Sequence, residues 1–302
     1  MCNLTKKMRL TVFTPTYNRR SKLIILYHSL LKQNPEEFIW LIVDDGSTDD
    51  TKDLVQLWIL EGRIAIEYYY QHNGGKMRAH NKAVKICKTE LFICVDSDDH
   101  LVNGIISQLI KLWDAHKADS KRIGIIGKHG ISEREAIGKG IFPNVLYVHF
   151  EDLFNYYEGD TEICFRTDIL KQHLFPEIQG EKFITEDYIY LEMNNEYFIL
   201  FDNIIAVGIY EADGYTKHMN RITYENPVGC MYYNSQRLKY IKNLKDQIIS
   251  CSKYVMYSLI AKKKTSHKFT LLQRILMSLL LPFSYVAYYK RKKQYLSDLQ
   301  KN

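Results

Sequence analysis

Short apolar runs and longer amphipathic segments alternate along the first 130 residues of the chain. The short runs are rich in β-branched, aliphatic and aromatic residues, as buried strands are, and cover residues 9–14, 38–45, 64–70, 91–96 and 122–128. The longer segments carry apolar residues at helical spacing and cover residues 20–33, 49–60, 76–87 and 101–116. Strands separated by helices of this length predict βαβ crossovers and an α/β fold with a mainly parallel sheet and flanking helices.

Residues beyond 130 follow no such alternation. Up to about residue 214 the pattern is irregular, and beyond residue 222 the chain reads as helical and basic. Residues 222–302 hold fifteen Lys and Arg against three Asp and Glu, a net charge of +12, so the other 221 residues carry −6. An acidic body with a basic tail indicates that the tail meets something anionic, either nucleic acid or a membrane face.

The tail contains a mostly apolar run at residues 275–289, followed by the basic sequence KRKK and preceded by AKKKTSHK. The run is shorter than the roughly 20 residues that span a bilayer, and Pro282 is expected to interrupt it. Association with an anionic membrane surface is one interpretation. A buried helix that packs on the rest of the protein is the other. No nucleic-acid reader motif accompanies the charge, so a nucleic-acid partner is not expected.

The start of the chain and its cysteines indicate a cytoplasmic protein. The first residues, MCNLTKKMRLTVFTP, do not form a signal peptide. The six cysteines are scattered, with no pair at CxxC spacing. Neither a zinc site nor a disulfide framework is indicated, and reduced thiols are expected.

Polar loops follow the first four expected strands. They read TPTYNR, DDGSTD, HNGGK and DSDD. In parallel sheets, ligands bind outside the carboxyl ends of the strands, so these loops are expected to converge on one site. The first strand is not followed by GxGxxG, and the chain has no GxxxxGK[ST], which disfavours a dinucleotide-binding Rossmann protein and a P-loop protein.

Three carboxylates, Asp96, Asp98 and Asp99, end the fourth expected strand. An EF-hand loop is excluded because Leu101 stands where glycine is needed and Ser107 where glutamate is needed. The DxDx[TV] pattern of haloacid-dehalogenase-like phosphatases is imperfect, and a solvated acidic turn explains one such residue better than three. A DxD site fits, in which hard oxygen ligands bind Mg²⁺ or Mn²⁺ that bridges a diphosphate.

The other loops offer candidates for nucleotide binding. After Pro15, Tyr17 can lie against a flat base or simply pack the loop. The carboxylate of Asp45 can accept a hydrogen bond from N3–H of uracil or thymine, where cytosine presents an acceptor; the turn beside it also caps the next helix. At a helix start, Lys76 and Arg78 can favour phosphate binding or form a solvated basic turn.

A later carboxylate pair, Glu186 and Asp187, stands at the start of an apolar-periodic segment. Capping of a helix by either residue is one explanation. The other is a general base that takes the proton from an attacking sugar hydroxyl.

Taken in order, TPTYNR, VDDGSTDDT, NGGK…HN, DSDD and TED resemble family 2 glycosyltransferases of the GT-A fold, over about residues 9–215. The sequences GDTEICFRTDIL, FPEIQGEKFITED and YEADGYTKHM further resemble bacterial members that build capsule, exopolysaccharide or lipopolysaccharide. The resemblance implies sugar transfer with inversion from a nucleotide-sugar, commonly UDP-linked, with Mn²⁺ or Mg²⁺ as cofactor. It implies these roles: Pro15, Tyr17 and Asp45 around the base; Asp96, Asp98 and Asp99 at the metal, with Asp98 the main ligand; Asp187 or Glu186 as base; and His218, with Lys217, near the metal or diphosphate.

The expected organisation is a catalytic domain at 1–221, with a nucleotide-sugar half at about 1–130 and an acceptor half at about 131–221. Residues 222–302 are expected to form a helical, basic, membrane-associating extension. The acceptor is expected to be a saccharide or lipid-linked saccharide at the inner face of the cell membrane. The alternatives are a nucleotidyltransferase or phosphatase that uses the same carboxylates, or a non-catalytic scaffold of glycan assembly.

Overall fold

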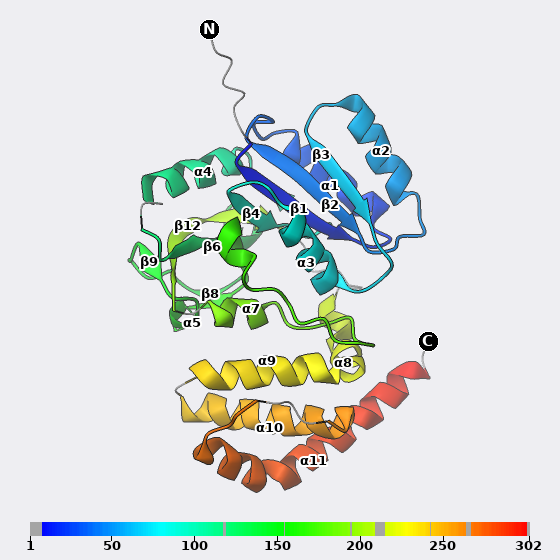
Figure 1. Cartoon of the computed structure of the whole chain (residues 1–302), viewed down its shortest axis with the longest axis vertical. Coiled ribbons are helices and arrows are strands. Elements are labelled where there is room, and N and C mark those ends of the chain that lie inside the picture. Colours follow the sequence, from blue (N-terminus) through cyan, green and yellow to red (C-terminus); the bar gives the residue numbers. More distant parts are fainter. Residues whose placement is uncertain are drawn as a thin grey trace. The chain divides into compact units, whose positions relative to one another are not determined.

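The computed structural model describes residues 8–116, 119–153, 155–193, 195–208, 215–241, 243–263 and 267–300 (Figure 1). The chain divides into two compact units. The first comprises Met1–Leu174 with Met193–Ile209, and the second comprises Phe175–Glu192 with Tyr210–Asn302. The predicted boundary at residue 221 between catalytic domain and extension stays a prediction, because compactness alone does not define a catalytic domain.

The first unit is built on one mixed sheet. Across the sheet its strands are β3 (Ile66–Tyr70), β2 (Phe38–Asp44), β1 (Leu10–Thr16), β4 (Leu91–Cys94), β11 (Thr161–Arg166), β6 (Arg122–Ser132), β12 (Tyr197–Val207) and β5 (His100–Leu101). The first four are parallel to one another, as predicted. The fifth predicted strand, β6, does not extend this parallel set, because β11 lies antiparallel between β4 and β6.

Small strands complete the first unit. β7 (Glu135–Ala136) pairs with β6, and β9 (Tyr147–Val148) pairs with β12. β8 (Gly138–Gly140) and β10 (Tyr157–Gly159) form a separate two-stranded sheet. All four lie in the region whose sequence pattern is irregular.

Helices cover both faces of the sheet because its strands carry apolar side chains on both sides. The helices of this unit are α1 (Arg20–Leu30), α2 (Thr51–Glu61), α3 (Lys76–Ile86), α4 (Ile105–His116), α5 (Phe150–Leu153) and α6 (Thr167–Leu170). On one face, Val12 and Ile93 belong to a core that includes residues of α1, α2 and α4. On the other face, the rings of Phe13 and Phe92 stack on each other, and both meet the ring of His80 from α3 in a T-shaped arrangement.

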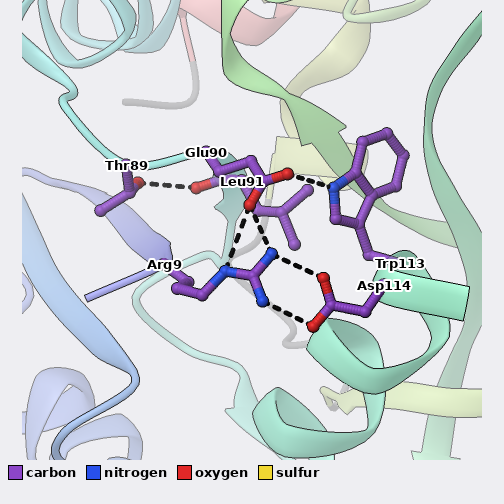
Figure 2. A network of polar contacts seen from close by, with 6 residues as sticks. All are labelled: Arg9, Thr89, Glu90, Leu91, Trp113 and Asp114. Atoms are coloured by element: carbon purple, nitrogen blue, oxygen red, sulfur yellow. Dashed lines mark hydrogen bonds and ion pairs between the residues drawn. The ribbon is translucent and has the colours of Figure 1, made fainter. Parts of the chain in front are cut away.

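A polar network ties the amino ends of β1 and β4 to α4 (Figure 2). The Arg9 guanidinium donates to Asp114 at 2.6 and 2.9 Å and pairs with Glu90. Glu90 also accepts from the indole N–H of Trp113 at 2.7 Å. These contacts raise the pKa of Arg9. The network lies at the amino ends of these strands, away from the loops that follow their carboxyl ends.

The second unit is helical. Its helices are α7 (Asp187–Glu192), α8 (Tyr215–Glu225), α9 (Pro227–Tyr240), α10 (Leu244–Ala261) and α11 (Leu271–Leu299). Glu181 caps α9 by accepting the backbone N–H groups of Val228 at 2.8 Å and Gly229 at 2.7 Å. A small core between α9 and α10 includes Met231 and Tyr254.

One expectation about this unit is wrong. Pro282 does not interrupt the apolar run, because α11 continues through it from Leu271 to Leu299. Proline removes one hydrogen bond of a helix, but Pro282 is exposed, so its ring does not meet the helices on which α11 packs. A capping box between Thr270 and Gln273 starts this helix.

Candidate active site

Four loops meet at the carboxyl edge of the parallel strands. Thr16, Asp44 and Tyr70 are partners in register at the ends of β1, β2 and β3, and β4 runs parallel to β1 on its other side. The loops after these strands are TPTYNR, DDGSTD, HNGGK and DSDD. The structure therefore brings together the four loops that the sequence places at strand ends.

The first two loops are fastened to each other by Asn18. Its side-chain oxygen accepts the backbone N–H of Thr48 at 2.8 Å, and its own N–H donates to Ser47 Oγ at 2.9 Å. Asn18 has a left-handed backbone conformation, φ 52°, which asparagine tolerates better than most residues. Tyr17 lies beside this anchor and is 48 % exposed, so its ring is available to a ligand.

The two aspartates that end β2 have different tasks. Asp44 is buried and accepts the Ser47 N–H at 2.7 Å and the Tyr68 hydroxyl at 2.6 Å. Burial and this contact raise the pKa of Tyr68. Asp44 thus holds the turn, and Asp45 turns toward the loop after β3.

Asp45 organises that loop directly. Its carboxylate accepts the Gln71 amide at 2.7 Å and the backbone N–H groups of Gly74 at 2.8 Å and Gly75 at 2.7 Å. Three donors occupy most of the roughly four acceptor positions of a carboxylate. A nucleotide base that donates a hydrogen bond to Asp45 therefore has to use the remaining acceptor position of the carboxylate or displace the Gln71 amide.

The carboxylates of DSDD are not equivalent. Asp96 pairs with Lys76 at 2.6 Å, and Asp98 pairs with Arg19 at 3.0 Å. Asp99 is mostly buried and faces His129 Nε2 at 3.7 Å. The chain itself therefore supplies positive charge to an acidic cluster whose members would otherwise repel one another.

Asp99 belongs to a small buried cluster with His129 on β6 and Glu162 on β11, and His129 Nδ1 lies 2.7 Å from Glu162. Burial and the charge of Glu162 raise the pKa of Asp99 to about 8. Burial lowers the pKa of His129, but its bond with Glu162 and the charges of Glu162 and Asp99 outweigh this and bring it to about 9. Potential metal-ligand atoms of the three side chains lie within 4.8 Å of one another.

Asp99 and His129 leave no room for a side chain at position 208. A Cβ at Gly208, at the end of β12, would lie 1.9 Å from Asp99 Oδ1, so only glycine fits there. His129, Glu162, Arg19 and Gly208 are the functional candidates that sequence reasoning missed. Arg19 and Glu162 stand inside motifs that resemble the family, whereas nothing in the sequence around His129 distinguishes it.

The two basic residues after β3, Lys76 and Arg78, make different contacts. Lys76, at the first turn of α3, reaches Asp96. Arg78 turns back and donates to the Gly74 carbonyl at 2.6 Å, which stabilises the loop. Of the two predicted phosphate ligands, Lys76 is therefore in contact with DSDD and Arg78 supports the loop that leads to it.

The remaining candidates belong to the second unit. Burial and the charge of Glu186 raise the pKa of Asp187 to about 6, and the Tyr233 hydroxyl donates to it at 3.4 Å. His218, on α8, is exposed. The side chain of Lys217 lies outside the described residues. The roles assigned to Asp187, Glu186 and His218 stay predictions.

A divalent cation fits the residues at DSDD. The side chains of Asp96 and Asp98 are 43 % and 28 % exposed and offer the hard oxygen ligands that Mg²⁺ and Mn²⁺ prefer. Their present partners, Lys76 and Arg19, are long cationic side chains that are 22 % and 29 % exposed, and pairs at a partly exposed edge are weak.

Comparison with known proteins identifies the family. The sequence profile described as Glycosyl transferase family 2 matches residues 11–171. The chain belongs to glycosyl transferase family 2. It is 29 % identical over 174 residues to the poly(ribitol-phosphate) β-N-acetylglucosaminyltransferase TarS of Staphylococcus aureus, across 56 % of this chain and 30 % of TarS. It is 36 % identical over 94 residues to the putative teichuronic acid biosynthesis glycosyltransferase TuaG of Bacillus subtilis, across 31 % of this chain and 37 % of TuaG.

Solved structures show the fold of this family 2 chain. The structure of S. aureus TarS 1–349 in complex with UDP-GlcNAc matches with a TM-score of 0.63 at 16 % identity, over 95 % of this chain and 92 % of that one. The mannosyltransferase PcManGT from Pyrobaculum calidifontis, in complex with GDP-Man and Mn²⁺, matches with a TM-score of 0.55 at 15 % identity, over 95 % and 83 %. The predicted family and the predicted GT-A-like fold class are both confirmed.

We expect Asp45→Asn to loosen the loop at 71–75. The amide has one acceptor oxygen where the carboxylate now accepts three donors, so the free energy of unfolding should fall by about 1–3 kcal/mol in urea titrations. Asp50→Asn is the matched control, because Asp50 precedes α2 and its side chain makes no capping bond there. Equal stability of Asp45→Asn and wild type would contradict this role.

We expect Arg19→Gln to increase the affinity for Mn²⁺ in the absence of nucleotide, because Asp98 loses its counter-ion. A partly exposed pair worth about 1 kcal/mol corresponds to about a fivefold change in Kd, measured by calorimetry. The neighbouring Arg20→Gln, whose backbone N–H rather than side chain contacts Asp49, should leave it unchanged. An unchanged or weakened affinity in Arg19→Gln would show that the pair does not compete with metal.

Proposed function

We propose that this protein is an inverting, metal-dependent glycosyltransferase. It moves a sugar from a nucleotide-sugar, a UDP-sugar, to a saccharide or lipid-linked saccharide acceptor in the synthesis of a bacterial surface polysaccharide such as a capsule. The observation that carries this proposal is the edge where Tyr17, the Asp45 loop and the cation-paired DSDD carboxylates meet. Family membership and the names of TarS and TuaG support it.

The donor is proposed to be UDP-linked for two reasons. Tyr17 offers an exposed ring against which a base can stack, and Asp45 offers an acceptor that suits N3–H of uracil and repels cytosine. The related fold of TarS has been solved with UDP and with UDP-GlcNAc. Pro15, beside Thr16 at the end of β1, is proposed to lie next to the same base.

Asp98 and Asp96 are proposed to hold Mn²⁺ or Mg²⁺, with Asp99 adjacent and His218 as a further ligand. PcManGT, of related fold, has been solved with Mn²⁺. The metal supplies positive charge to the diphosphate of the donor. Lys76 and Arg19, released from the carboxylates, are then free to stabilise the negative charge that develops on the departing nucleotide, and Arg78 keeps the loop that carries Lys76 in place.

Asp187 is proposed as the general base, with Glu186 as the alternative. A pKa of about 6 keeps Asp187 ionised near neutral pH yet basic enough to accept a proton from the acceptor hydroxyl. The hydroxyl then attacks the anomeric carbon from the face opposite the nucleotide, through an oxocarbenium-like state and without a covalent intermediate.

The place of action is proposed to be the cytoplasmic face of the cell membrane, with the protein bound peripherally through residues 222–302. The net charge of +12 in that region supports binding to an anionic surface. A lipid-linked acceptor is presented at such a surface.

Incubation with labelled UDP-, GDP- and dTDP-sugars and Mn²⁺ tests the proposed activity. Transfer of the label to an acceptor, with release of intact UDP and loss of transfer in Asp98→Asn, is the expected result. Release of inorganic phosphate without transfer would favour the phosphatase alternative. Full complementation of a null strain by Asp98→Ala would favour a scaffold.

We expect Asp187→Asn to abolish sugar transfer and to stabilise the protein at neutral pH. The folded state raises the pKa of Asp187 from 3.8 to about 6, so the ionised form costs stability as pH rises through this window, and the cost is full above it. Relative to wild type, the melting temperature of Asp187→Asn should therefore rise between about pH 4 and pH 7.

Asp246→Asn is the control for this pH dependence, since Asp246 is a partly exposed carboxylate of the same unit that lies 3.8 Å from Arg237. The melting temperature of Asp246→Asn relative to wild type should not rise between about pH 4 and pH 7. Full transfer activity in Asp187→Asn would exclude Asp187 as the base.

A further inference from the structure

Helix α11 buries two polar side chains on an inner side that also carries apolar ones such as Met277. Gln273 and Ser284 are buried against the neighbouring helices. Gln273 donates to the Leu238 carbonyl at 2.9 Å, and Ser284 donates to the Ser252 carbonyl at 3.2 Å. A helix at the surface of a soluble protein normally buries its apolar side and exposes its polar side.

The opposite side of α11 is apolar and exposed. Leu272, Ile275, Leu279 and Val286 recur at helical spacing and share one stripe, and Phe283 flanks it. Leu279 is 67 % exposed and Phe283 is 70 % exposed. A contiguous apolar stripe of this length marks a surface that is covered by a partner.

Charge complementarity identifies the chemistry of that partner. Exposed lysines, Lys290, Lys292 and Lys293, follow the stripe directly, and Lys268 precedes the helix. The sequence contains no Asp or Glu from residue 262 to residue 297. Apolar side chains with basic residues at both ends of the stripe suit the interface of an anionic bilayer, and exposed tyrosines such as Tyr285 and Tyr289 suit the headgroup level.

The contacts of α11 also indicate whether this helix lies on a bilayer or crosses it. By length and composition this helix could cross a membrane. However, its inner side is fastened along its length: Gln273 and Ser284 bond to neighbouring backbone, Arg291 donates to Asn220 and Thr223, and Tyr295 stacks on Tyr224 at 4.2 Å. Crossing would break these contacts and place the polar side chains of Gln273 and Ser284, without their present partners, in or near hydrocarbon, which is costly.

We infer that α11 lies in the plane of one leaflet of an anionic bilayer, with its apolar stripe in the acyl boundary and its inner side docked on α8, α9 and α10. This inference deepens the proposed function. The position of α11 is argued from its own residues, and only the reason for binding, which is to bring the enzyme to a lipid-linked acceptor, rests on the proposed function. It names the membrane-binding surface and its orientation.

Flotation of the full chain with phosphatidylcholine vesicles, with and without phosphatidylglycerol, tests the surface. The protein should float with the anionic vesicles. Leu279→Glu with Phe283→Glu should weaken binding roughly tenfold or more. Replacing Lys290, Lys292 and Lys293 with Gln should weaken it about fivefold for each lysine. The control Leu57→Glu with Leu60→Glu changes two apolar residues of α2 that are 58 % and 83 % exposed and should bind like wild type.

Depth measurements test the orientation. Leu272→Trp, Leu279→Trp and Val286→Trp each add one exposed indole to a protein whose own tryptophans, Trp40, Trp58 and Trp113, are buried. An in-plane helix predicts the same quenching depth with brominated lipids at all three positions. A quenching depth that is greatest at Leu279 and shallower at both Leu272 and Val286 would show a spanning helix and overturn the inference.

Two further outcomes are decisive. Absence of vesicle binding, or a dimer in solution that Leu279→Glu with Phe283→Glu dissociates, would overturn the inference in favour of a free surface or a second copy of the chain. An assay of sugar transfer to a water-soluble acceptor, which needs no membrane, tests the proposed function independently of membrane binding. If the protein transfers sugar but does not bind vesicles, only the inference about α11 is contradicted. If it binds vesicles but transfers no sugar, only the proposed function is contradicted.

Discussion

The constraint on which the site depends is the repulsion among three carboxylates at the end of a buried strand. β4 delivers Asp96, Asp98 and Asp99 to one edge of the sheet, and each meets a basic side chain from a different element: Lys76, Arg19 and His129. The surrounding loops can be understood as the means of bringing those cations there. Asn18 fixes the loop that carries Arg19, and Asp45 fixes the loop that leads to Lys76.

A ligand can displace two of these cations, Lys76 and Arg19, from their carboxylates, but not the third, His129. Lys76 and Arg19 are partly exposed and can leave their carboxylates for a diphosphate, which frees Asp96 and Asp98 for metal. His129 is held by Glu162 and closed in by Gly208, so Asp99 keeps its partner. The cluster thus contains an exchangeable outer part and a fixed inner part. This explains why metal and nucleotide are expected to bind together rather than separately.

The sequence predicts the elements that depend on local pattern. The first four strands, the helices between them and the loops at their ends lie where apolar periodicity and turn residues place them, within a few residues. It does not predict β11 between β4 and β6, because the pairing of distant strands leaves no local mark. His129 and Glu162 are invisible for the same reason, since only that pairing brings β6 and β11 beside DSDD. In α11, composition predicts a helix, but which side is buried depends on contacts such as that of Ser284 with Ser252, which have no periodic signal.

Calorimetric titration of UDP into the protein, with and without Mn²⁺, tests the central claim most directly. If DSDD is a metal and diphosphate site whose carboxylates are held by the chain's own cations, UDP should bind markedly more tightly with Mn²⁺, and Mn²⁺ more tightly with UDP, by the same factor. Equal UDP affinity with and without Mn²⁺, or no binding of UDP in either case, would contradict the account.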